Sequence, residues 1–203
     1  MQESIRSWAR SANPVETLRQ GPADSWRTHW DALAELGVFM VAQSEEVGGA
    51  DGEVVDLAAM LEATAGALAS GPVLSTALAA LVVGRSGEPA AKQWGPELAE
   101  GALPVGVALG GNVTATVEAD GSLVLGGAAG YALGAAPDLG VLLSATRGDD
   151  VVWCLVEAGA AGLTVDAAQN VDVTVPLATV TCDAVRVSGD RVLTDVPAGR
   201  VSE

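Results

Sequence analysis

The chain has 203 residues, of which 49% are apolar, and a formal net charge of −16 at pH 7. This size and composition predict a folded, globular protein and exclude a disordered one. Both halves are acidic, which predicts that the chain binds no nucleic acid, and no apolar run reaches the roughly 18 residues that a membrane span needs.

The first half has the periodicity of helices. A first helix is predicted over residues 26–37, with Asp24 and Ser25 as candidates for its N-cap. Its apolar residues recur on one face, which is the pattern of a helix that packs against a core. They are Trp26, Trp30, Leu33 and Leu36.

A second helix is predicted over residues 53–69, and two more over residues 73–83 and 88–101. Pro72 stands at the expected first position of the third helix. The acidic loop at residues 44–53 lacks the alternating ligand spacing of a calcium site, which predicts a solvated connection. The apolar stripe predicted for the second helix is Val54, Leu57, Leu61, Ala65 and Leu68.

From Pro104 the periodicity changes to that of strands. Short runs rich in Val, Leu and Thr alternate with turn sequences, with no helical pattern between them, which favours an antiparallel β-barrel or sandwich. The predicted strands are residues 104–109, 112–119, 122–133, 139–146, 150–158, 162–168, 177–187 and 191–196. The sequence therefore predicts an α+β chain with an N-terminal helical domain, residues 1–103, and a β domain, residues 104–203.

Few residues have the chemistry of a metal site or a nucleophile. Cys154 and Cys182 each lie in an apolar run, which predicts two buried, reduced thiols. His29, the only histidine, lies beside an apolar stripe without a nucleophile or carboxylate at a matching spacing, so no catalytic role is assigned to it. Two cysteines and one histidine are too few for a metal site. The first residues lack the pattern of a secretory signal, and a cytoplasmic location is expected.

The glycine-rich stretch at residues 126–140 is a candidate for a phosphate loop. Such a loop needs a glycine turn that leads into a helix, whose N-terminus supplies amides and a favourable dipole. The spacing fits neither the dinucleotide nor the P-loop pattern, and Pro137 and Asp138 predict a turn before another strand. The glycines are therefore predicted to allow a bend or close packing in the strand.

The order of these segments resembles the acyl-CoA dehydrogenase family. The positions that match short motifs of its N-terminal helical domain are Leu36-Gly37, Glu45-Glu46 and Gly48-Gly49. The segments similar to the passage into its middle β domain, and to strands within it, are residues 92–109, 127–146 and 180–193. The resemblance covers nearly the whole chain and implies a flavin-dependent enzyme that desaturates an acyl-CoA thioester at its α,β bond.

The positions that the resemblance assigns to FAD contacts are changed in this chain. The family's Thr-Glu-Pro loop, which ends in Gly-Ser, becomes Leu109, Gly110 and Gly111 with no hydroxyl. Its Trp and its Ser or Thr become Tyr131 and Leu133, and a leucine cannot hydrogen-bond the flavin. An unsatisfied polar group costs roughly 1–3 kcal/mol, so FAD binding by this chain alone is expected to be weak.

No catalytic residue is assigned, because the resemblance places the catalytic glutamate in a third domain, helical, that none of these 203 residues match. The chain is therefore interpreted as a non-catalytic half of an oligomeric bacterial enzyme of lipid metabolism. Its expected partner is an acyl-CoA dehydrogenase-like subunit, or the second half of the same chain, which supplies flavin, base and acyl-CoA. The alternatives are a fragment of an ordinary active acyl-CoA dehydrogenase, and a scaffold that binds neither flavin nor acyl-CoA.

Overall fold

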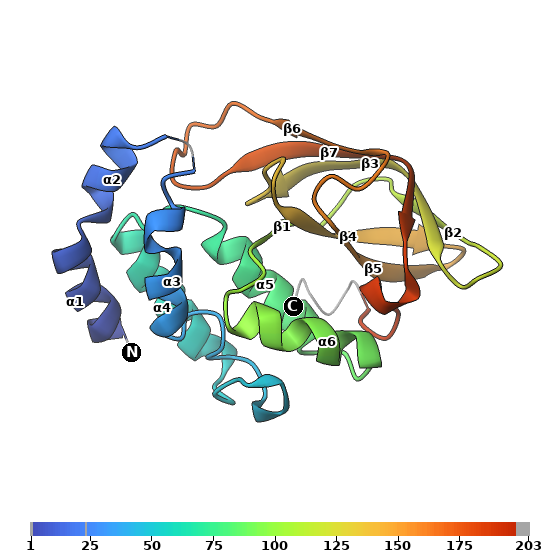
Figure 1. Cartoon of the computed structure of the whole chain (residues 1–203). Helices are drawn as coiled ribbons and strands as arrows, with labels where there is room; N and C mark the ends of the chain where they lie inside the picture. Colours follow the sequence, from blue (N-terminus) through green and yellow to red (C-terminus); the bar gives the residue numbers. More distant parts are fainter. Residues whose placement is uncertain (1, 23, 198–203) are drawn as a thin grey trace.

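The computed structural model describes residues 2–22 and 24–197, in which helices are followed by strands (Figure 1). The helices are α1 (Gln2–Ala12), α2 (Pro14–Gln20), α3 (Arg27–Glu35), α4 (Val54–Gly66), α5 (Val73–Val83) and α6 (Pro89–Ala99), with short 3-10 turns at Glu45–Val47 and Gly189–Arg191. The strands are β1 (Val105–Ala108), β2 (Thr114–Val117), β3 (Leu123–Leu133), β4 (Gly140–Arg147), β5 (Asp150–Val156), β6 (Leu163–Ala167), β7 (Leu177–Val187) and β8 (Val192–Leu193). The α+β class is confirmed, and each predicted strand is present at its predicted place.

Two N-terminal helices, α1 and α2, were not among the predicted elements. In α1, Ile5 is fully buried, and the helix packs against α4, where the Gln2 side chain donates to the carbonyl of Ala59 at 2.9 Å. Pro14 occupies the first turn of α2, where its missing N–H costs nothing. Contact with α4 therefore stabilises α1, whose apolar residues Ile5, Trp8 and Ala12 recur at helical spacing.

The predicted N-cap of α3 is wrong. Trp26 has helical backbone angles at the N-cap position, and no side-chain hydrogen bond caps the helix. Asp24 and Ser25 instead form a tight turn, in which their carbonyls accept the amides of Arg27 and Thr28 at 3.1 Å each. Pro72 likewise precedes α5 as its N-cap, one residue earlier than predicted.

The predicted apolar stripe of α4 is only partly correct. Leu57 is buried, but Val54 is 52% exposed, and Leu68 lies beyond the end of the helix with 44% of its surface exposed. The buried face instead contains Met60 and Ala63. The contacts that α4 makes with its neighbours therefore turn the helix away from the face that local periodicity suggests.

The strands form one sheet in the order β6-β7-β3-β1-β4-β5-β8, with β2 paired to β3 and β4. Most pairs are antiparallel, as predicted, but β1 pairs with β4 in parallel, as does β2. A wholly antiparallel sheet is therefore wrong in these two pairings. The two parallel pairings arise because β3 pairs with β2 along its first half and with β1 at its last residue, where Leu133 pairs with Val107.

The glycines of β3 bend the strand, as predicted. The register with β7 shifts at two points, between Leu125 and Gly127 and between Ala128 and Gly130. Both glycines have positive φ, +118° and +72° respectively. A β-carbon on Gly127 would lie 2.2 Å from the carbonyl oxygen of Asn112, so glycine is required at this approach.

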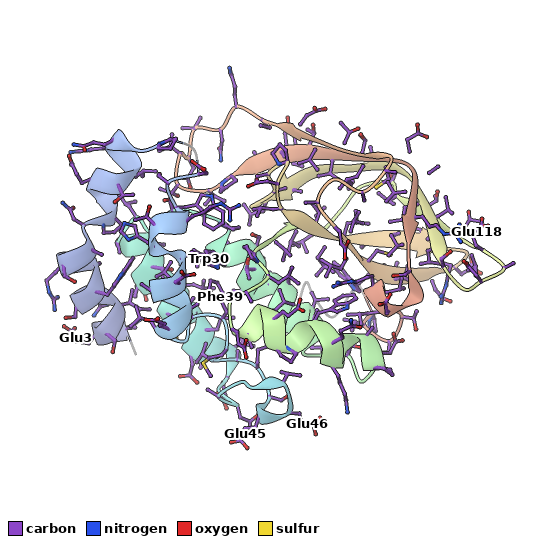
Figure 2. All side chains as sticks on the ribbon, viewed as in Figure 1. Glu3, Trp30, Phe39, Glu45, Glu46 and Glu118 are labelled. Carbon is purple, nitrogen blue, oxygen red and sulfur yellow. The ribbon has the colours of Figure 1, made fainter. Side chains whose placement is uncertain are left out.

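Three groups of buried side chains form the core. One lies within the sheet and contains both cysteines. A second joins α5 and α6 to the sheet through Trp94 and Trp153. The third holds the first helices together around Trp30 and Phe39, whose ring centres are 4.6 Å apart (Figure 2). The division into domains at residue 103 stays a prediction.

Within the described part of the chain, no helix is long and apolar enough to cross a membrane.

Candidate functional site

Two of the predicted FAD-contact residues are Tyr131 of β3 and Leu109, the residue after β1. Val107 pairs with Leu133 in the antiparallel ladder between β1 and β3, so the same register continued by two residues places Leu109 opposite Tyr131. Leu109 is 55% exposed, Tyr131 is 68% exposed and Leu133 is half-buried. The structure therefore brings these three side chains to one region of the sheet.

This region begins where α5 stops covering the sheet. Residues two apart on a strand share a face, and Val105 and Val107 are buried against residues of α5 and α6. Further along the same face, Leu109 and Tyr131 are exposed. The uncovered region joins Leu109, Tyr131 and Leu133 and is called the β1–β3 face below.

The loop after β1 is fixed against β3 at one point. The amide of Asn112 donates to the carbonyl of Ala128 at 2.7 Å. Gly111 has a φ of +112°, and a β-carbon there would lie 2.5 Å from the same carbonyl oxygen. Gly110, in contrast, has no atom within 4 Å of its β-carbon position. Gly111 is therefore required for packing, whereas Gly110 lies in open space.

Two residues at the start of α5 border this region, and neither was predicted as a site residue. The hydroxyl of Thr76 accepts the amide of Val105, the first residue of β1, at 3.1 Å. The Ser75 hydroxyl donates to the carbonyl of Pro72 at 3.0 Å and lies directly against Gly134, the residue after β3. The available signal was an adjacent Ser and Thr in a helix that is otherwise apolar.

The strands of the β1–β3 face carry no basic side chain. From Val105 to Leu133 the charged side chains are those of Glu118 and Asp120, which lie in the turn between β2 and β3 at the other end of β3. Hydrogen bonds from Ser122 and Arg186 hold the pKa of Asp120 at about 2. A phosphate at this loop would therefore find backbone amides and no arginine or lysine on these strands.

His29 lies away from this region, among the first helices. Its Nε2 atom is 2.9 Å from the Thr17 hydroxyl, and its ring packs edge-on against Trp8 with centres 5.5 Å apart. Burial lowers its pKa below the ordinary value. These contacts give His29 a packing role.

Both cysteines are free and buried, as predicted. Burial raises the pKa of Cys154 to about 12 and also raises that of Cys182. Thiols with raised pKa values are poor nucleophiles and poor metal ligands. Among the described residues, no three His, Cys, Asp or Glu side chains gather as a metal site.

Comparison with known proteins assigns the chain to a family. The model of the acyl-CoA dehydrogenase N-terminal domain matches residues 1–102. The acyl-CoA dehydrogenase FadE34 of Mycobacterium tuberculosis is 35% identical over 206 residues, which cover 94% of this chain and 27% of that protein. The chain belongs to the acyl-CoA dehydrogenase family.

Solved acyl-CoA dehydrogenase structures share the fold. A variant of the Tcur3481-Tcur3483 steroid ACAD superposes with a TM-score of 0.81 at 23% identity, over 99% of this chain and 59% of the other. The ChsE4-ChsE5 complex from Mycobacterium tuberculosis superposes with a TM-score of 0.78 at 23% identity, over 98% of this chain and 56% of the other. Some structures with this fold are FAD complexes. This acyl-CoA dehydrogenase chain spans little more than half of the solved chains and about a quarter of FadE34.

Proposed function

We propose that this chain is part of a flavin-dependent acyl-CoA dehydrogenase and that its β1–β3 face lies against the flavin ring of FAD. The observation that carries this proposal is the exposure of Tyr131, 68%, beside the exposed Leu109. A large aromatic ring left open next to a leucine is a surface suited to a flat, apolar partner. FAD complexes among the structures with this fold support the same ligand.

The residues present fit the flavin ring better than its polar edge. Tyr131 and Leu109 offer apolar contact, and Gly110 leaves room for close approach of a ligand to the backbone. Leu133 has no hydrogen-bonding group. A polar atom of the ring therefore stays without a partner, which costs roughly 1–3 kcal/mol of binding free energy. FAD, when bound, would accept the hydrogen removed from the acyl chain. We therefore propose that this chain orients the ring and that a partner supplies the remaining polar contacts.

The proposed partner is an acyl-CoA dehydrogenase-like subunit or another segment of the same chain, through which acyl-CoA also binds. The ChsE4-ChsE5 complex, a structure with this fold, supports the pairing of such subunits. Exposed apolar residues such as Leu74, 41% exposed on the first turn of α5, provide surface for the contact. We place this enzyme in bacterial lipid metabolism, in the cytoplasm, and propose no catalytic role for this chain's own side chains.

A substitution at Leu133 tests the proposal. Leu133→Thr restores a hydroxyl on the β1–β3 face, and we expect it to tighten FAD binding about tenfold, as expected for one regained hydrogen bond. Tyr131→Ala should weaken binding by a similar factor. Val124→Thr, on the same strand but away from the face, is the control and should change nothing. Unchanged FAD affinity in both test variants, measured by flavin fluorescence quenching, would remove the basis of the proposal.

A second candidate function is a scaffold that binds neither FAD nor acyl-CoA. The absence of basic side chains between Val105 and Leu133 favours it, since nothing on these strands offsets the charge of a pyrophosphate. A ligand that binds the folded state raises its melting temperature. Thermal unfolding with saturating FAD and an acyl-CoA separates the two candidates: no shift with either ligand favours the scaffold.

A further inference from the structure

The chain after β7, residues 190–196, crosses from the sheet to α6 and is called the strap below (Figure 1). Its one strand, β8, is two residues long and pairs with β5 at the edge of the sheet. A segment with so few main-chain hydrogen bonds tends to open locally, before the rest of a structure unfolds. Contacts made by side chains must therefore keep the strap closed.

Two buried tryptophans bind the inner side of the strap. The indole N–H of Trp94, on α6, donates to the carbonyl of Asp190 at 2.8 Å. The indole N–H of Trp153, on β5, donates to the carbonyl of Val196 at 3.1 Å. Leu193 and Val196 are themselves buried, in the same core group as the two indoles. The closed strap therefore completes the core between α6 and the sheet, and opening it takes the acceptors away from both indoles.

Two carboxylates bind the outer side of the strap, and they act in opposite directions. Glu88, the N-cap residue of α6, accepts the amide of Thr194 at 3.1 Å and also its hydroxyl. Asp195, on the strap, accepts the hydroxyl of Ser86 at 2.6 Å and the amide of Gly87 at 2.8 Å. Each segment thus supplies a carboxylate to the other. These four hydrogen bonds are called the latch below.

The reciprocal arrangement ties the latch to the buried contacts. Movement of the strap away from α6 breaks all four bonds of the latch together, because Thr194 and Asp195 are adjacent and their partners are adjacent as well. Hydrogen bonds to a charged acceptor are stronger than neutral ones, so the latch favours the closed strap. The latch also lies at the surface, where water can replace its bonds. Opening the strap therefore costs less than unfolding the sheet.

We infer that the strap is a conformational device that opens and closes as one unit while the sheet stays folded, and that the latch sets how often it opens. The closed strap holds α6 on the sheet, and α6 packs against α5, whose start borders the β1–β3 face. Opening therefore loosens the attachment of these helices without breaking the central ladders. The strap and the latch contain no residue of the β1–β3 face, so the inference is independent of the proposed flavin contact.

Hydrogen exchange of the ¹⁵N-labelled chain, followed by NMR, tests whether the strap opens as a unit. Four N–H groups report on it: the amides of Gly87 and Thr194 and the indoles of Trp94 and Trp153. We expect the four to share one protection factor, at least about a hundredfold below that of the amides of β4 in the middle of the sheet. Four unrelated protection factors, or a shared one equal to that of β4, would overturn the inference.

Variants of the latch test its control of the opening. Asp195→Asn keeps the shape of the side chain but removes its charge and one acceptor oxygen. We expect it to speed exchange about fivefold at Gly87, and by the same factor at Thr194 and at the Trp94 indole, which bind other groups. Glu88→Gln should act in the same way. Faster exchange only at the N–H groups that the substituted carboxylate itself accepts, or no change at any, would overturn the inference.

Matched controls separate the latch from the general negative charge of the chain. Asp149→Asn and Glu45→Gln make the same two chemical changes at exposed positions, in the β4–β5 turn and in the 3-10 turn after α3. Neither carboxylate accepts a hydrogen bond from the residues of the strap or of α6. Both controls should leave the four protection factors unchanged. Equal acceleration by the controls and by the latch variants would overturn the inference.

Discussion

A β-carbon on Gly134 would lie 1.9 Å from the hydroxyl oxygen of Ser75, so the end of β3 touches the start of α5. Gly134 also has a φ of +70°, a conformation that other residues adopt at a cost. On the other side of the same helix start, Thr76 holds the first amide of β1. These contacts fix α5 against β1 and β3, and thereby set where the β1–β3 face begins.

Gly134→Ala should destabilise the protein by about 2–4 kcal/mol, through the positive φ and the collision with α5. Gly126→Ala is the matched control on the same strand, because nothing lies within 4 Å of its β-carbon position and its φ is not positive. The control should lie within about 0.5 kcal/mol of the wild type. Urea unfolding of the three proteins measures the difference, and equal stability of the two variants would show that this contact is not tight.

Thr76→Val should cost about 1–3 kcal/mol, although valine has nearly the same shape. Thr76 is fully buried, and its loss leaves the amide of Val105 without an acceptor. Thr116→Val, at an exposed position of β2, makes the same chemical change without a buried partner. A loss of similar size in the exposed control would contradict the assignment of this hydrogen bond.

His29 should make stability fall as the solution becomes acidic. Its pKa is lowered by burial in the folded state, so the unfolded chain binds the proton more readily. The contribution of neutral His29 is complete above the ordinary pKa of about 6.5 and declines as pH falls toward the folded value. The stability difference between wild type and His29→Gln should therefore shrink between pH 7.5 and pH 5. A difference independent of pH would contradict this.

The two thiols should not react with a thiol reagent such as DTNB in the native protein at pH 8. Cys154 has a pKa of about 12, and both side chains are buried. Unfolding in guanidinium should release both for rapid reaction, which serves as the internal control. Fast reaction of either thiol in the folded protein would show that the core of the sheet opens readily.

Local patterns in the sequence predicted the strands well and the pairing poorly. Alternation of Val and Leu with smaller residues fixed the place of strands such as β4 and β5, because it depends on neighbouring residues alone. The parallel pairing of β1 with β4 depends on the bend in β3, which joins residues far apart in the chain.

The candidate site shows the same division between local and long-range signals. The family resemblance identified Tyr131, Leu133 and Leu109 separately, yet only the register with β1 places Leu109 opposite Tyr131. A cleft of about 500 Å³ that Ser70 lines is assembled from four connections separated by up to about three quarters of the chain, and no motif marks it. Sites of this kind become visible when the packing of loops is known.

The most direct test of the flavin account is the FAD content of the purified chain after incubation with excess FAD and gel filtration, read from its visible absorption spectrum. The account predicts that the folded wild-type chain elutes nearly colourless, because Leu133 gives no hydrogen bond, and that Leu133→Thr retains more flavin than the Val124→Thr control. A stoichiometric flavin band in the wild type that persists in Tyr131→Ala would contradict it.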